Sequence, residues 1–132
     1  MADIAPRASG SALSDMLITL DRLSAFYQAD EAYFRAIFWQ IMTSDSAETR
    51  SAAHDALIDL VTARLTRAAE AGELRPEIDT KDLGNRLGQN LLANMGTWAG
   101  GHVDIAEMID HTKVVWLALL RSAATDAARQ HL

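Results

Sequence analysis

The chain has 132 residues, of which 49% are hydrophobic, with seven glycines, two prolines and no cysteine. This composition fits one globular domain with a substantial core, and it excludes disulfides, thiolate metal sites and cysteine nucleophiles. The formal net charge of -6 disfavours nucleic acid as a direct partner, because binding to phosphates needs a basic surface.

Residues 1–10 read as a flexible lead-in, and residues 11–132 as a single helical domain. The N-terminus has no apolar segment of the kind found in signal peptides. The longest apolar run, Val114 to Leu120, is far shorter than the ~20 residues that a membrane span needs. We therefore expect a cytoplasmic protein with no membrane partner.

The apolar residues recur with helical spacing, and no stretch alternates over the length of a strand. An all-α, five-helix domain is predicted. The expected helices run from about Ser11 to Gln28, after Asp30 to Thr43 or Ser44, from Asp45 or Ser46 to Gly72, over residues 80–98, and from Asp104 to about Ala128. Ser11, Asp30, Asp79 and Asp104 are the expected N-caps, and Asp45 with Glu48 resembles a capping box.

A helix at the surface of a protein has one apolar stripe and one solvent-exposed face, and the last two helices are more apolar than this pattern. Gly84 and Gly88 lie one turn apart in the fourth helix and indicate that another backbone comes very close. The fifth helix is apolar nearly all round between Val114 and Leu120. A second copy would cover both helices in a four-helix bundle about a two-fold axis, although a fifth helix at the core of a monomer also fits. The candidate dimer-interface residues are Leu83, Gly84, Leu87, Gly88, Leu91, Met108, Val115, Trp116 and Leu119.

Two segments carry a family resemblance: AAEAGELRPEIDTKDLGNRLGQNLLANMGTW and, after a link, IAEMIDHTKVVWLALLRSA. With them, the chain from about Ser11 to Ala124 resembles the C-terminal half of a TetR-type transcriptional regulator. In that family a helix ends at an alanine-glycine-charged-leucine segment, and an extended link leads to an aspartate-capped helix with a late glycine and an aromatic residue. A very apolar helix closes the domain. The matching positions here are Gly72, Leu74, Asp79, Leu83, Gly96 and Trp98.

The resemblance implies a homodimer through the last two helices, a pocket for a small apolar ligand, and a helix-turn-helix DNA reader ahead of the helical domain. The sequence departs from the family in the last respect, because only ten residues precede Ser11 and no basic recognition helix lies elsewhere. We therefore expect a truncated or stand-alone sensing and dimerisation domain of a repressor, which reaches DNA only through a reader absent from this chain.

Polar residues within apolar stripes and the aromatic cluster supply the candidate ligand-binding residues. Arg64 could meet a ligand carboxylate or lie at the edge of its stripe, and Asn94 could bind ligand or form an interhelical hydrogen bond across the dimer seam. His54 also fits a structural role, and the aromatic residues also fit an ordinary core. The candidates are Tyr27, Phe34, Phe38, Met42, His54, Leu57, Arg64, Asn94 and Trp98.

No catalytic motif is present, the four histidines lack metal-ligand spacing on one helix face, and we expect no enzyme activity, metal or cofactor. Two alternatives to the regulator remain. One is a small helical enzyme or cofactor-binding protein that uses the aromatic pocket. The other is a pairing partner that dimerises with a full-length regulator and removes one of its two DNA readers.

Overall fold

The structure is a computed structural model that describes residues 11–132. The described residues form an all-α domain, as the sequence predicts, with a short sixth helix after the five long ones. The helices are α1 (Ala12–Gln28), α2 (Glu31–Met42), α3 (Ala47–Glu70), α4 (Thr80–Ala99), α5 (Ile105–Ala123) and α6 (Asp126–Arg129). The lead-in expected over residues 1–10 lies outside the described part of the chain.

The helix starts follow the capping residues of the sequence. Ser11, Asp79 and Asp104 are confirmed as N-caps, since each side chain accepts a backbone N–H from the first turn. Asp30 precedes α2 but makes no side-chain capping hydrogen bond. At α3 the cap is Ser46, whose hydroxyl accepts the amide of the third helical residue. These caps fix the register of the turns that join the helices.

Helix α3 ends in a left-handed glycine turn, and the residue after this glycine caps the start of α1. Gly72 has φ 76°, and the amide of Glu73 donates to the carbonyl of Ala68 at 2.9 Å, which is the hydrogen bond of a Schellman motif. The turn presents the Glu73 carboxylate to the start of α1, where it accepts the amides of Ala12 at 2.9 Å and Leu13 at 3.0 Å. A carboxylate is favoured there by the helix dipole.

The predicted end of the fifth helix at Ala128 is wrong, because α5 stops at Ala123 and a separate α6 follows. The link between α3 and α4 runs beside this break. The amide of Arg75 donates to the carbonyl of Ala123 at 3.0 Å, and the amide of Thr125 donates to the carbonyl of Glu73 at 2.9 Å. At the break, these long-range backbone hydrogen bonds replace the hydrogen bonds that a continuous helix would form.

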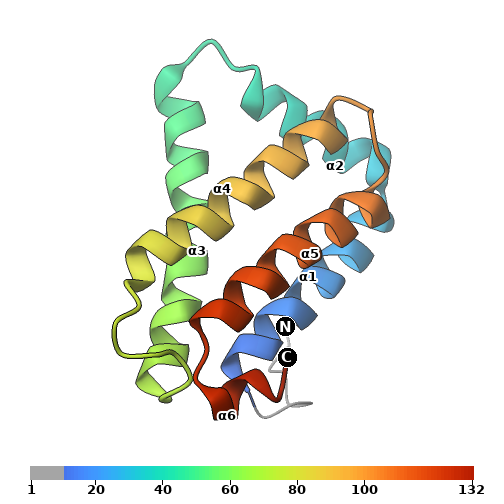
Figure 1. Ribbon diagram of the computed structural model, residues 1–132. Helices are drawn as coiled ribbons and strands as arrows, with labels where there is room; N and C mark the ends of the chain where they lie inside the picture. Colours follow the sequence, from blue (N-terminus) through green and yellow to red (C-terminus); the bar gives the residue numbers. More distant parts are fainter. Residues whose placement is uncertain (1–10) are drawn as a thin grey trace.

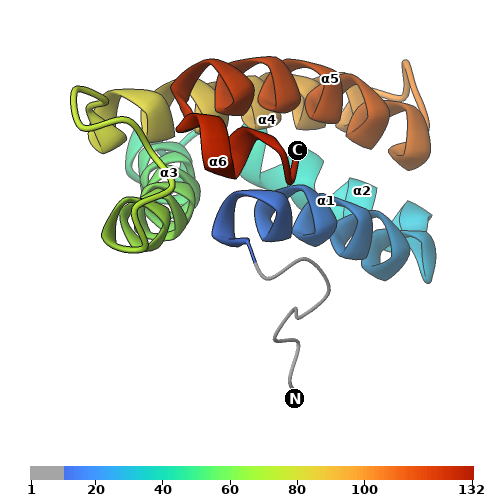
Figure 2. The same ribbon diagram turned by 60° about the horizontal axis from the view of Figure 1, so that its bottom comes forward.

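Figure 1 shows α4 lying across α3, while α5 and α1 run side by side. Figure 2 shows α4 and α5 together on one side of the molecule, with α1 and α3 on the other, and Figure 1 shows α6 at one end. Helix α2 contacts both α3 and α4 near the end of the molecule opposite α6. The long helices therefore form two layers, and α2 closes one end.

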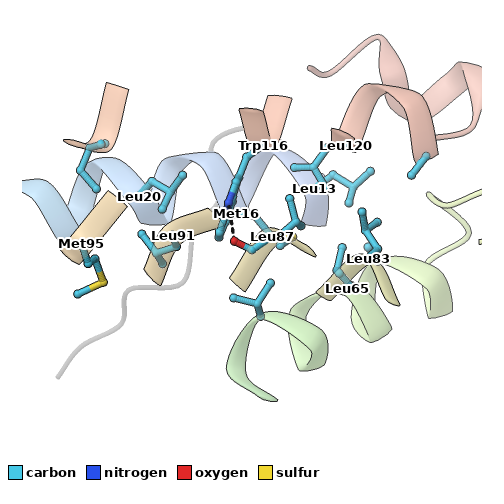
Figure 3. Close-up of a cluster of buried hydrophobic side chains, with 14 of the residues drawn as sticks. Leu13, Met16, Leu20, Leu65, Leu83, Leu87, Leu91, Met95, Trp116 and Leu120 are labelled. Atoms are coloured by element: carbon cyan, nitrogen blue, oxygen red, sulfur yellow. Dashed lines mark hydrogen bonds between the residues drawn. The ribbon is translucent and has the colours of Figure 1, made fainter. Parts of the chain in front are cut away.

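The core lies between these layers and is built from leucine and methionine side chains of α1, α3, α4 and α5 (Figure 3). Trp116 of α5 enters it and donates its indole N–H to the carbonyl of Leu87 at 3.0 Å. This hydrogen bond satisfies the indole N–H, which would otherwise be buried without a partner. The labelled core residues are Leu13, Met16, Leu20, Leu65, Leu83, Leu87, Leu91, Met95, Trp116 and Leu120.

The two glycines of α4 mark the crossing with α3. A Cβ atom at Gly84 would lie 3.0 Å from Cα of Thr62, and one at Gly88 would lie 2.7 Å from Cγ1 of Ile58. The close backbone approach that the glycines indicate is therefore present. Its partner, however, is α3 of the same chain rather than α4 of a second copy, so the expected interface role of both glycines is corrected.

The same correction applies to most of the expected dimer-interface residues. Seven of the nine are buried within the single chain, where they form its own core: Leu83, Gly84, Leu87, Gly88, Leu91, Met108 and Trp116. A buried side chain is not available to a partner. Val115 and Leu119 of α5 remain accessible. The homodimer itself stays a prediction, and of its nine candidate interface residues only Val115 and Leu119 are accessible to a partner.

Candidate functional site

A cavity of about 390 Å³ lies between α2, α3 and α4 and opens to solvent. In Figure 1 these three helices surround the upper part of the molecule, where α2 bridges the ends of α3 and α4. The end of α1 contributes one residue. The lining residues are Tyr27, Phe38, Ile41, Met42, Arg50, Ala53, His54, Leu57, Leu92 and Met95.

Five of the nine predicted ligand-binding residues line this cavity: Tyr27, Phe38, Met42, His54 and Leu57. The other five lining residues were not predicted: Ile41, Arg50, Ala53, Leu92 and Met95. Ile41 and Met95 belong to apolar faces and look like ordinary core in sequence. Arg50 precedes His54 by one helical turn, which places both on one face of α3. The sequence does not show that α2 meets this face, so the spacing is only a partial signal.

Two predicted aromatic residues lie behind the cavity wall. Trp98 is fully buried, and its ring stacks on Tyr27 at 5.4 Å between centroids and tilts toward Phe38 at 6.3 Å. Phe34 also packs against Tyr27, with 5.2 Å between ring centroids. Neither Trp98 nor Phe34 lines the cavity. Both support side chains that do, so the aromatic cluster is partly core and partly lining.

The remaining two candidates lie away from the cavity. Arg64 is half-buried where α3 meets α1 and donates to the hydroxyl of Thr19 at 3.3 Å. The amide nitrogen of Asn94 donates to the hydroxyl of Thr112 at 2.9 Å. The Asn94 contact is an interhelical hydrogen bond, as one alternative held, but it joins α4 to α5 inside one chain. Neither residue is placed to touch a ligand in this cavity.

One carboxylate fixes α2, which forms a wall of the cavity. Oε2 of Glu31 accepts hydrogen bonds from the indole N–H of Trp98 at 3.0 Å, the backbone amide of Ile105 at 3.2 Å and the guanidinium of Arg35 at 3.0 Å. These donors come from the end of α4, the start of α5 and α2 itself. The first turn of α2 is thereby held against both neighbouring helices.

The polar side chains that line the cavity can all donate hydrogen bonds, and none is acidic. Burial raises the pKa of the Tyr27 hydroxyl above 10.0, because desolvation disfavours the phenolate, so this group stays protonated near neutral pH. The Arg50 guanidinium donates to the carbonyl of Ser44 in the turn before α3. Nδ1 of His54 lies 3.4 Å from a carboxylate oxygen of Asp55, whose side chain is 70% exposed. No Asp or Glu lines the cavity.

The outward side of α5 presents a second surface. Val114 is 70% exposed and Val115 is 37% exposed, and Ala118 is exposed one turn later. We call these three residues the α5 strip. They lie on one face of the helix because residues three and four apart are neighbours. The exposed residues of the adjacent α4 include Ala93. Within residues 11–132, Val114 is the less covered of the two valines.

Among the described residues, no three His, Asp or Glu side chains gather closely enough to hold a metal ion. The helices of this part of the chain are also too short or too polar to span a membrane. Comparison of the chain with family models, with curated proteins and with solved structures finds no match.

Proposed function

We propose that this chain is the small-molecule-sensing and homodimerisation domain of a cytoplasmic TetR-type transcriptional repressor. The observation that carries the proposal is the solvent-open, largely apolar cavity between α2, α3 and α4, beside a helix pair whose outer side bears the exposed Val114 and the partly exposed Val115. A cavity of this size with a few polar groups is typical of a site for a small organic ligand.

Helix α4 links the two surfaces. Leu92 and Met95 face the cavity, while Asn94 bonds to Thr112 of α5. A ligand that binds one position of α4 better than another shifts the population toward that position. Because the Asn94–Thr112 hydrogen bond joins the two helices, α5 moves when α4 moves. The movement displaces the α5 strip and changes the packing of two copies. Helix shifts at subunit interfaces are a common form of such transitions.

The chain carries a net charge of -6, which disfavours direct contact with DNA. In the proposed regulator, DNA is bound by a helix-turn-helix part outside this chain, and the domain sets the separation of two such readers. Readers on a two-fold dimer must match the spacing of their half-sites, so a small change in packing is sufficient to alter DNA affinity.

The cavity is tested by a neutral fluorescent probe, N-phenyl-1-naphthylamine, whose emission rises in apolar surroundings. Ala53 lines the cavity and its neighbour Ala52 is exposed on the same helix, so Ala53→Phe and Ala52→Phe are matched variants. We expect saturable binding to the wild type and to Ala52→Phe, and binding at least about tenfold weaker to Ala53→Phe, a change of roughly 1.4 kcal/mol. Equal binding to both variants, or no saturable binding to the wild type, would contradict a ligand site in this cavity.

A further inference from the structure

The charge of the cavity is opposite in sign to that of the chain. The sequence carries 18 acidic and 12 basic residues, yet the lining contains one arginine, one histidine and no carboxylate. A guanidinium that has no carboxylate beside it attracts an anion. The local charge therefore selects for a ligand with a negative group.

The two basic residues of the cavity are neighbours on α3. Arg50 and His54 are four residues apart, which places them one above the other on the same helix face. No carboxylate among the described residues pairs with Arg50, which donates only to the Ser44 carbonyl and leaves further guanidinium N–H groups open. His54 is near Asp55 through Nδ1, and its Nε2 has no partner in the described part of the chain.

The rest of the same wall is apolar. Along α3 the lining runs from Arg50 through His54 to Leu57, seven residues or about 10 Å along the helix axis at ~1.5 Å per residue. Leu92 and Met95 of α4 also line the cavity. Polar donors thus lie at one end of the α3 wall and hydrocarbon at the other, an arrangement that matches an elongated molecule with one polar end.

We propose that the cavity binds an amphipathic monoanion of the alkyl or arylalkyl carboxylate class. The carboxylate lies against Arg50 and His54, because a guanidinium matches a carboxylate with two parallel N–H groups. The apolar part lies along Leu57, Leu92 and Met95. This inference rests on the sensing function proposed above and names the chemical class of its ligand.

Three probes of equal chain length separate charge from hydrophobicity: octanoate, octan-1-ol and octylammonium. Titration calorimetry at neutral pH is expected to rank octanoate first. In Arg50→Gln the affinity for octanoate falls about tenfold or more, the change expected when a charged hydrogen bond is lost, while the affinity for octan-1-ol is unchanged. Arg50→Lys keeps the charge and retains the preference for octanoate over octan-1-ol.

Two further variants separate binding from structure. Arg67→Gln removes an exposed arginine that lies on the same helix but does not line the cavity, and it leaves all three affinities unchanged. Because Arg50 also holds the turn at Ser44, its replacement can disturb the fold, which thermal unfolding without ligand reveals. His54→Gln leaves that contact intact and must also lower the ratio of octanoate to octan-1-ol affinity.

The outcomes distinguish this inference from the sensing function. Equal affinity for octanoate and octan-1-ol, a preference for octylammonium, or an unchanged affinity ratio in His54→Gln or in a folded Arg50→Gln overturns the carboxylate assignment. If none of the three probes binds but N-phenyl-1-naphthylamine does, the ligand class is wrong and the sensing site stands. If the neutral probe also fails to bind, the sensing function fails with it.

Discussion

The ring of Tyr27 stacks on the buried indole of Trp98, with 5.4 Å between centroids and 27° between planes. Tyr27 lines the cavity, and Trp98 is fixed from behind by the Glu31 carboxylate, which accepts its N–H at 3.0 Å. The position of one cavity wall therefore depends on a charged group at the start of α2 that does not touch the cavity.

Replacing Glu31 by alanine tests this dependence. Glu31→Ala leaves the N–H groups of Trp98 and Ile105 without their acceptor, and we expect the free energy of unfolding to fall by roughly 2–4 kcal/mol in urea titration, since each unsatisfied buried donor costs about 1–3 kcal/mol. Glu77→Ala, which removes an exposed ion pair with Arg75, is the control and changes it by at most about 1 kcal/mol. Equal effects of the two variants would show that Glu31 does not hold the wall.

Local signals in the sequence account for most of the helix boundaries. A capping side chain binds the backbone amide of a residue two or three positions later, so the signal is local in sequence. Ser11, Asp79 and Asp104 are therefore recognisable without a structure. The end of α5 was missed because residues 122–129 are rich in alanine and continue the helical pattern. The local signal there is Thr125, whose hydroxyl caps α6 by accepting the amide of Ala128 at 3.2 Å. Backbone hydrogen bonds to the distant link around Glu73, which the sequence does not show, also hold the break.

Periodicity identifies which residues share a face but not which element meets that face. For this reason the close approach at Gly84 and Gly88 was predictable, whereas its partner, α3, was not. The cavity shows the same limit. Its aromatic side was predictable from clustering, but Arg50 is exposed and lies near the start of its helix, where arginine usually faces solvent. Only the placement of α2 makes it part of a wall.

The α3–α4 crossing predicts a contrast between two glycine substitutions. Alanine is favoured over glycine in a helix interior by about 1 kcal/mol. At Gly84 the added methyl meets the backbone of Thr62, and overpacking costs about 1–3 kcal/mol, so Gly84→Ala is expected to lower the unfolding free energy. At Gly96 it meets only the flexible end of Met42, so Gly96→Ala is neutral or stabilising. Thermal unfolding measures both, and a stabilised Gly84→Ala would refute the close crossing.

The raised pKa of Tyr27 predicts a loss of stability at alkaline pH. Because the folded state holds the phenol proton more tightly than the unfolded chain, this contribution is complete below pH 10.0 and is lost as the pH rises through the higher pKa of the folded state. Absorbance at the phenolate band in Tyr33→Phe, where Tyr27 is the remaining tyrosine, is expected to titrate above 10.0. A midpoint at or below that value would mean that Tyr27 is not desolvated.

The central claim is that two copies of this chain pair through the outer sides of α4 and α5. Val114→Glu places a charge in the α5 strip, and Leu60→Glu places one at an exposed leucine of α3 as the control. Light scattering at micromolar concentration should give twice the chain mass of 14.4 kDa for the wild type and for Leu60→Glu, and a single-chain mass for Val114→Glu. A wild-type mass near that of one chain would contradict the account.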